Sequence, residues 1–187
     1  MKTILFVVAV TFCAASCFSQ GIISITFDGP PIVPVFTRQI VQQYDEAGMT
    51  FWSPTGEGFG RERYSGTAHL AGAPPFSLSF KASDDSLFGI ISVQLAGYNA
   101  DLPDVPGSFV GHRSDGSTVR TDFPVSGFVF QTFYFGPEFN NLTRVDVLSF
   151  GSLDNLVVLI PEPSTWCLLA MLGLPAFVLW RRGVRRR

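Results

Sequence analysis

The sequence predicts an all-β fold in which two antiparallel sheets pack against each other as a sandwich. Two observations lead to this prediction. Apolar and polar residues alternate with a period of two in short runs, which is typical of strands that bury one face. Turn sequences rich in Gly, Pro and Asp separate these runs at short intervals. Many short strands at this spacing favour a two-sheet sandwich, and a jelly roll is the arrangement we expect.

The expected strands begin near residue 22. In residues 22–27, Ile23, Ile25 and Phe27 share one face of the strand. The dipeptide Asp115-Gly116, between two alternating runs, predicts a hairpin turn. Residues 32–44 have helical character that Pro34 interrupts, so we expect a loop or a short turn of helix there. The other expected strands are residues 76–80, 90–95, 108–112, 118–123, 128–135, 143–150 and 153–159.

Composition excludes several classes of protein. The 187 residues suit one domain, which we place at residues 20–160, with an extension at each end. Only 15% of the residues are charged, against about 25% in ordinary soluble domains, which argues against disorder. The 18 Gly and 13 Pro residues argue against a helical bundle. Residues 20–160 hold 7 Lys and Arg against 14 Asp and Glu, and this net charge of −7 predicts no nucleic-acid partner.

The N-terminus, residues 1–19, predicts a signal peptide and therefore the export machinery as a partner. Lys2 is followed by an apolar run from residue 4 to residue 15, and Cys17-Phe18-Ser19 offers a cleavage site before Gln20. Two alternatives stay open. The apolar run could be a buried first strand, or Cys17 could be lipidated, because Ala14-Ala15-Ser16-Cys17 loosely resembles a lipoprotein signal.

The C-terminus predicts one transmembrane helix at about residues 164–180. Its length is at the low edge of the about 17–25 residues that span a bilayer. Trp166 and Trp180 bracket the segment as interfacial anchors, and Arg181 and Arg182 begin a basic tail that reaches residue 187. Basic residues stay in the cytoplasm, so the domain is expected on the other side of the membrane. The alternative is a buried terminal helix.

Residues 161–187 as a whole resemble the PEP-CTERM sorting signal of bacterial surface and exopolysaccharide-associated proteins. The resemblance rests on Pro161-Glu162-Pro163, the short apolar helix and the Arg-rich tail, in that order. It implies recognition by an exosortase, a membrane-embedded transpeptidase that cuts near Pro161, Glu162 and Pro163. The protein would pass through the inner membrane, with its C-terminus in the cytoplasm, to the cell surface or the extracellular polysaccharide. Alternatively, the helix is retained and the protein stays in the membrane.

The domain resembles a galactose-binding-like jelly roll, which is the architecture of many carbohydrate-binding modules. The similar pieces are Ile25-Thr26-Phe27-Asp28 and residues 88–96 and 152–158. The resemblance implies a structural calcium where the first and last strands meet, with Asp28 and Asp154 at the matching positions. Turn capping by these Asp residues is the alternative. We expect no other cofactor.

The sequence does not predict an enzyme. It has no Gly-x-Ser-x-Gly, phosphate-loop or His-Glu-x-x-His motif, and its three cysteines, Cys13, Cys17 and Cys167, all lie in the two terminal segments. Trp52 and Tyr98 are candidates for stacking against sugar rings. We therefore expect a structural or adhesive surface protein. The alternatives are a surface-displayed carbohydrate-binding module and, less well supported by the motifs, a secreted hydrolase.

Overall fold

The computed structural model describes residues 18–29, 39–64, 67–72, 77–98 and 103–163. The chain divides into two compact units, residues 22–160 on the one hand and residues 1–21 with 161–187 on the other. The description below concerns the first unit and the strands that enter it. The predicted signal-peptide helix and transmembrane helix lie outside the described residues, apart from residues 18 and 19, which begin the first strand. None of the described residues form a helix long and apolar enough to cross a membrane.

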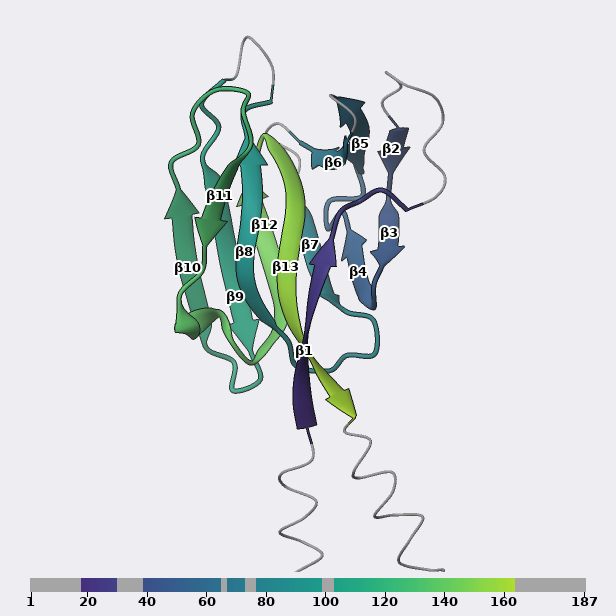
Figure 1. Ribbon diagram of the computed structural model, residues 1–187, viewed down its shortest axis with the longest axis vertical. Coiled ribbons are helices and arrows are strands. Elements are labelled where there is room, and N and C mark those ends of the chain that lie inside the picture. Colours follow the sequence, from purple (N-terminus) through teal and green to yellow (C-terminus); the bar gives the residue numbers. More distant parts are fainter. Residues whose placement is uncertain (1–17, 30–38, 65–66, 73–76, 99–102, 164–187) are drawn as a thin grey trace, which may run out of the picture. The chain divides into compact units, whose positions relative to one another are not determined.

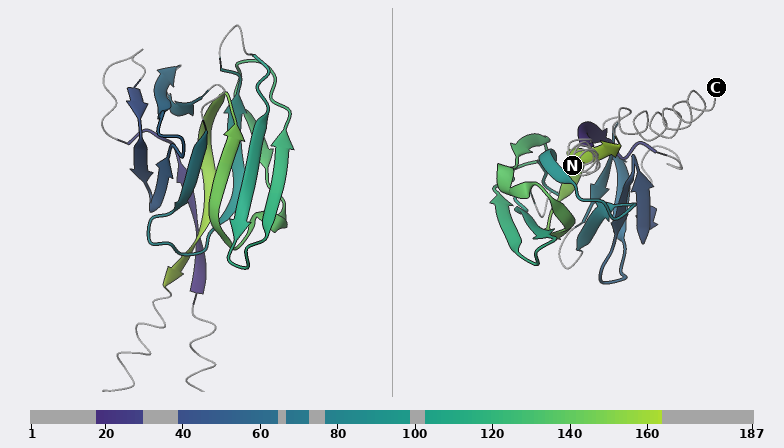
Figure 2. Two further views of the ribbon diagram at one scale, coloured as in Figure 1. Left: turned by 180° about the vertical axis from the view of Figure 1, so that it is seen from behind. Right: turned by 90° about the horizontal axis from the view of Figure 1, so that it is seen from below.

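The unit is an all-β sandwich of two antiparallel sheets, as the sequence predicts (Figures 1 and 2). One sheet has the strand order β11-β8-β13-β6-β5-β2, and β1 also pairs with β13. Its strands are β1 (Phe18–Ile25), β2 (Gln39–Val41), β5 (Phe59–Tyr64), β6 (Thr67–Ala71), β8 (Gly89–Ala96), β11 (Gln131–Tyr134) and β13 (Ser152–Pro163).

The second sheet has six strands in the order β10-β9-β12-β7-β4-β3. The chain crosses repeatedly between the two sheets, so neighbours within a sheet are mostly distant in sequence. A 3-10 helix, η1 (Pro137–Phe139), precedes the strand β12. The six strands are β3 (Gln43–Glu46), β4 (Met49–Trp52), β7 (Leu78–Ala82), β9 (Gly107–Arg113), β10 (Thr118–Phe123) and β12 (Leu142–Ser149).

Phenylalanine rings fill the space between the sheets. Phe51 lies 5.3 Å from Phe27 and 5.3 Å from Phe80, measured between ring centroids. Phe109 and Phe135 form a second group with perpendicular rings 5.2 Å apart. Because alternate residues of each strand face this core, the remaining residues of the six-stranded sheet form an outer face that points away from it. This outer face carries the candidate site.

Most predicted strands are present, but the sequence missed those between residues 39 and 71. The expectation of a loop or helical turn at residues 32–44 is wrong for residues 39–41 and 43–44, which belong to β2 and β3. In β5, Arg61 and Glu62 are both buried, and two adjacent buried charges conceal the alternation that marks a strand. The strand predicted at 128–135 is shorter in the structure, where β11 runs from Gln131 to Tyr134. Phe128 and Val129 precede it and are exposed.

Candidate functional site

A row of facing residues crosses the outer face of the six-stranded sheet. Trp52 of β4 lies opposite Ser79 of β7, and Ser79 lies opposite Asp146 of β12. The pairing continues through Val110 of β9 to Arg120 of β10. Directly opposed residues in a sheet share a face, so all five side chains project to the same side. We call these residues, Trp52, Ser79, Asp146, Val110 and Arg120, the outer row.

One end of the outer row forms a surface pocket of about 210 Å³. Trp52 and Leu148 supply apolar walls, while Arg144 and Asp146 supply charged groups. Pockets with aromatic and apolar walls and a few convergent polar groups are typical of binding sites for small organic groups. The full lining consists of Trp52, Pro54, Ser77, Leu78, Ser79, Arg144, Asp146 and Leu148.

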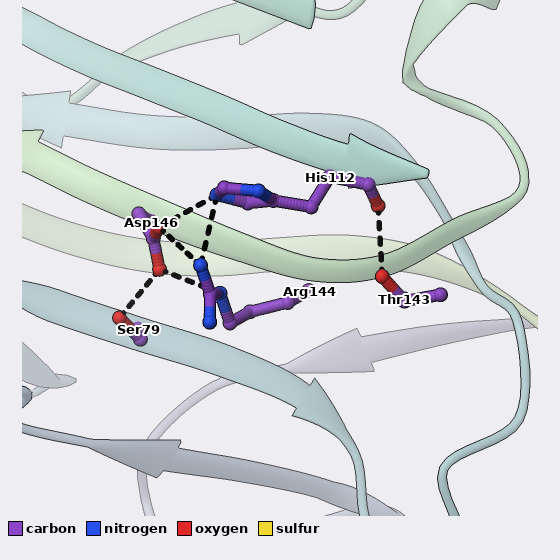
Figure 3. A network of polar contacts seen from close by, with 5 residues as sticks. All are labelled: Ser79, His112, Thr143, Arg144 and Asp146. Carbon is purple, nitrogen blue, oxygen red and sulfur yellow. Dashed lines mark hydrogen bonds and ion pairs between the residues drawn. The ribbon is translucent and has the colours of Figure 1, made fainter. Parts of the chain in front are cut away.

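Asp146 is the centre of a hydrogen-bonded network beside the pocket (Figure 3). Its Oδ1 accepts a hydrogen bond from the Ser79 hydroxyl at 2.7 Å and contacts Arg144 Nε at 3.1 Å. Its Oδ2 lies 2.7 Å from His112 Nε2 and accepts from Arg144 Nη2 at 3.1 Å. Both carboxylate oxygens are therefore engaged, and the contacts hold the Arg144 guanidinium and the His112 ring in fixed orientations.

The network is partly exposed to solvent. The side chain of Arg144 is 45% exposed and that of Asp146 is 24% exposed. The His112 main-chain carbonyl accepts a hydrogen bond from the Thr143 hydroxyl at 3.1 Å, which links β9 to β12 beside the network (Figure 3). The arrangement can present hydrogen-bond donors and acceptors, already oriented, next to an aromatic surface.

Cationic groups on the outer face are matched by carboxylates of the same chain. Arg144 pairs with Asp146, and Arg120 pairs with Asp122 at 3.0 Å. The hydrogen bond from Arg120, supported by one from Ser108, lowers the pKa of Asp122 below its ordinary value. Lys81 is likewise paired with Asp85. The face therefore offers polar groups without a net excess of positive charge.

Asp28 and Asp154, the predicted calcium ligands, each accept a main-chain hydrogen bond. Asp28 Oδ1 accepts from the Ala68 N–H at 3.2 Å, and Asp154 Oδ1 accepts from the Asn155 N–H at 2.7 Å. Within the described ranges, no group of three or more His, Cys, Asp or Glu side chains is placed to hold a metal ion. A calcium ion takes about six to eight oxygen ligands, so other oxygen donors would have to join these two. The calcium site stays a prediction.

The structure separates the two predicted sugar-stacking residues. Trp52 lines the pocket, whereas Tyr98 follows β8 of the other sheet and is half-buried. Pro161, Glu162 and Pro163 of the predicted sorting motif are the last three residues of β13. The predicted membrane anchors Trp166, Trp180, Arg181 and Arg182 lie outside the described residues.

Sequence reasoning gave none of the polar members of the site a functional role. These are Ser79, His112, Arg144 and Asp146, which come from three strands. A local signal was present for two of them, because Arg144 and Asp146 are two residues apart in an alternating run and therefore share a face. Their meeting with Ser79 depends on the order and register of the strands, which local alternation does not specify.

Comparisons with known proteins find little similarity to this chain. No protein-family model matches the chain, and no curated protein matches it. Among solved structures, the chain is similar to CBM29_1, a family 29 carbohydrate-binding module from Piromyces equi. The two are 11% identical, with a TM-score of 0.45 over 75% of this chain and 91% of that module. At that level of similarity, the likeness supports no inference about what this chain binds.

Proposed function

We propose that the sandwich binds a glycan on the outer face of its six-stranded sheet, with Trp52 as the surface on which a sugar ring stacks. The observation that carries the proposal is that Trp52 shares a pocket with the network around Asp146. A sugar ring has an apolar C–H face and a rim of hydroxyls. The indole suits the first, and charged hydrogen-bonding groups suit the second.

The fixed network favours binding of hydroxyl groups. Arg144 has five N–H donors and uses only part of them on Asp146 and His112, so it can donate to sugar hydroxyls, and the Ser79 hydroxyl oxygen, which donates to Asp146, can accept from them. The internal contacts of Asp146 orient these groups before any ligand arrives, which lowers the entropy cost of binding. We propose a binding role and not a catalytic one.

The outer face favours a neutral and extended glycan. Its cations already have carboxylate partners, so an acidic polysaccharide would have to compete with Asp122 and Asp146 for Arg120 and Arg144. Strands in a sheet are about 4.8 Å apart, so the four spacings of the outer row span about 19 Å. That length accommodates several sugar rings laid across the strands.

We propose a jelly-roll connectivity for the sandwich that carries this face.

A glycan array probed with the full chain tests the proposal. We expect binding to one class of neutral glycan, and we expect Trp52→Ala to weaken it at least about tenfold, as loss of a central aromatic anchor does. Tyr134→Ala is the matched control, since Tyr134 is an exposed aromatic on the other sheet and should bind like the wild type. Absence of glycan binding, or equal losses in both variants, would overturn the proposal.

We propose that the C-terminal segment delivers this domain to the cell surface or the extracellular polysaccharide. The support is the order of Pro161-Glu162-Pro163, an apolar segment and an Arg-rich tail in the sequence. The prolines disfavour a helix in their segment, and Glu162, the only charged residue of the motif, is the group that we propose an exosortase recognises. Release would leave the domain among the polysaccharides that the outer face is proposed to bind.

Mass spectrometry of the mature C-terminus tests this delivery route. We expect the wild type to lack the Arg-rich tail, and we expect the double variant Glu162→Ala with Pro163→Ala to keep it. Ser164→Ala next to the motif is the control and should be processed normally. A wild-type protein that retains residue 187 would show instead that the helix is kept as an anchor.

A further inference from the structure

The strand β10 ends the six-stranded sheet with a long and regular edge. The strands at the other ends of the two sheets, β2, β3 and β11, have 3, 4 and 4 residues, whereas β10 has 6. Short edge strands protect proteins against edge-to-edge pairing. The register of β10 with β9 runs without a shift from Thr118 to Phe123, so the edge is not interrupted by a bulge.

The hairpin geometry identifies which main-chain groups of β10 point outward. The Arg113 N–H binds the Ser117 carbonyl at 2.9 Å, which makes these two residues a hydrogen-bonded pair. Such pairs alternate along an antiparallel ladder, so the main chain of Val119, Thr121 and Phe123 binds β9. The N–H and carbonyl groups of Thr118, Arg120 and Asp122 therefore face away from the sheet.

We propose that β10 pairs with β10 of a second copy of this chain, antiparallel and with Thr121 on the two-fold axis. In this register, Arg120 of each copy lies opposite Asp122 of the other, and both residues carry outward main-chain groups. The two side chains are exposed, at 59% and 54%, and lie on the outer face. The dimer interface would therefore hold two Arg120 and two Asp122 side chains, with each Arg opposite an Asp of the other copy.

Charge selects this register over its neighbours. The neighbouring registers that keep outward main-chain groups opposed are shifted by two residues, which moves the two-fold axis by one residue and places Arg120 against Arg120 or Asp122 against Asp122. Opposed like charges destabilise a strand pair, whereas opposed unlike charges stabilise it. The sequence of β10 is therefore self-complementary in one antiparallel register, which is what a two-fold symmetric interface requires.

The apolar side of β10 supports the same pairing. Val119 and Phe123 are packed against the core but remain partly exposed. Phe123 also stacks on Phe133 of β11 with the ring centroids 4.9 Å apart. A second copy continuing the sheet would cover these side chains. Because one pair of strands buries a small area, we expect a weak dimer whose population rises with concentration.

Disulfide trapping of the full chain tests the register. Facing residues in a non-hydrogen-bonded pair have Cα atoms about 4.5 Å apart, which is within the range for a disulfide. In a background with Cys13, Cys17 and Cys167 changed to Ala, we expect Thr121→Cys to form a covalent dimer under mild oxidation. Thr118→Cys is the control, since its two copies would be about 20 Å apart in this register. A nonionic detergent keeps the apolar terminal segments from associating.

Charge variants of the Thr121→Cys chain distinguish this dimer from one that forms in another register or through another surface. Arg120→Asp and Asp122→Arg should each lower the yield of covalent dimer about tenfold or more, because each opposes like charges twice. An equimolar mixture of the two variants should restore the dimer as a heterodimer, and the chain with both changes should restore it as a homodimer. Trapping that is absent in the parent, equal for Thr118→Cys, or insensitive to these charges would overturn the proposal. None of these readouts depends on glycan binding.

Discussion

At the scale of single residues, Arg61 shows how a buried charge is accommodated in this fold. Its guanidinium donates to the Phe27 carbonyl through Nε at 3.0 Å and through Nη2 at 2.6 Å, and it also contacts the Gly29 carbonyl. It lies 4.4 Å from the centre of the Tyr44 ring. Arg61 of β5 thus holds the main chain that follows β1 in place by hydrogen bonds. A sequence pattern could not predict this, because the partners are carbonyl groups 32 and 34 residues away.

Tyr44 links the stability of this region to alkaline pH. Burial, together with a hydrogen bond of 2.9 Å from its hydroxyl to Glu46, raises the pKa of Tyr44 from 10.0 to about 12. The folded protein holds the phenol proton more tightly than the unfolded chain does. The resulting stabilisation is complete below pH 10 and is lost as the pH rises toward 12.

We predict that Tyr44→Phe removes this part of the pH dependence. Urea unfolding at pH 8 and pH 11 measures it. The wild type should lose up to about 1.4 kcal/mol more of its unfolding free energy between these pH values than the variant does. Tyr134→Phe is the control, because Tyr134 is 73% exposed, and it should behave like the wild type. Equal pH dependence in all three proteins would contradict the assignment.

At the scale of elements, local sequence signals predict strands and turns where the chain alternates and fail where charges are buried. The hairpin predicted at Asp115-Gly116 is confirmed, since it joins β9 to β10. Asp115 accepts hydrogen bonds from the Ser117 hydroxyl and from the Ser117 N–H, and these lower the pKa of Asp115 below its ordinary value. β5 was missed because Arg61 and Glu62 interrupt its apolar pattern.

We predict that Gly116→Ala lowers the unfolding free energy by about 1 kcal/mol. Gly116 has a φ of +82° and lies in open space, so the cost is one of backbone conformation and not of contact. Gly116→Asn should cost less, because Asn tolerates a positive φ, and Ser114→Ala on the same turn should cost little. Chemical denaturation measures all three. A Gly116→Ala variant as stable as Ser114→Ala would show that the turn does not impose the positive φ.

At the scale of the whole molecule, the candidate site comes from strand order and not from any single segment. Trp52 could be selected from the sequence because it is an aromatic residue with a polar edge. Ser79 and Asp146 are 67 residues apart and meet because β7 and β12 are neighbours in the sheet. The two-sheet architecture was predictable from alternation, whereas the order of strands in each sheet depends on non-local pairing that a local pattern does not encode.

The central claim is that the outer face of the six-stranded sheet is the glycan-binding surface. Nuclear magnetic resonance of the full chain, titrated with the glycan captured on the array, tests it most directly. We predict that the largest shifts fall on the Trp52 indole N–H and on the amides of Ser79, Arg144 and Asp146. Shifts centred instead on Tyr98 or Tyr134 of the other sheet, with the Trp52 signal unmoved, would contradict the account.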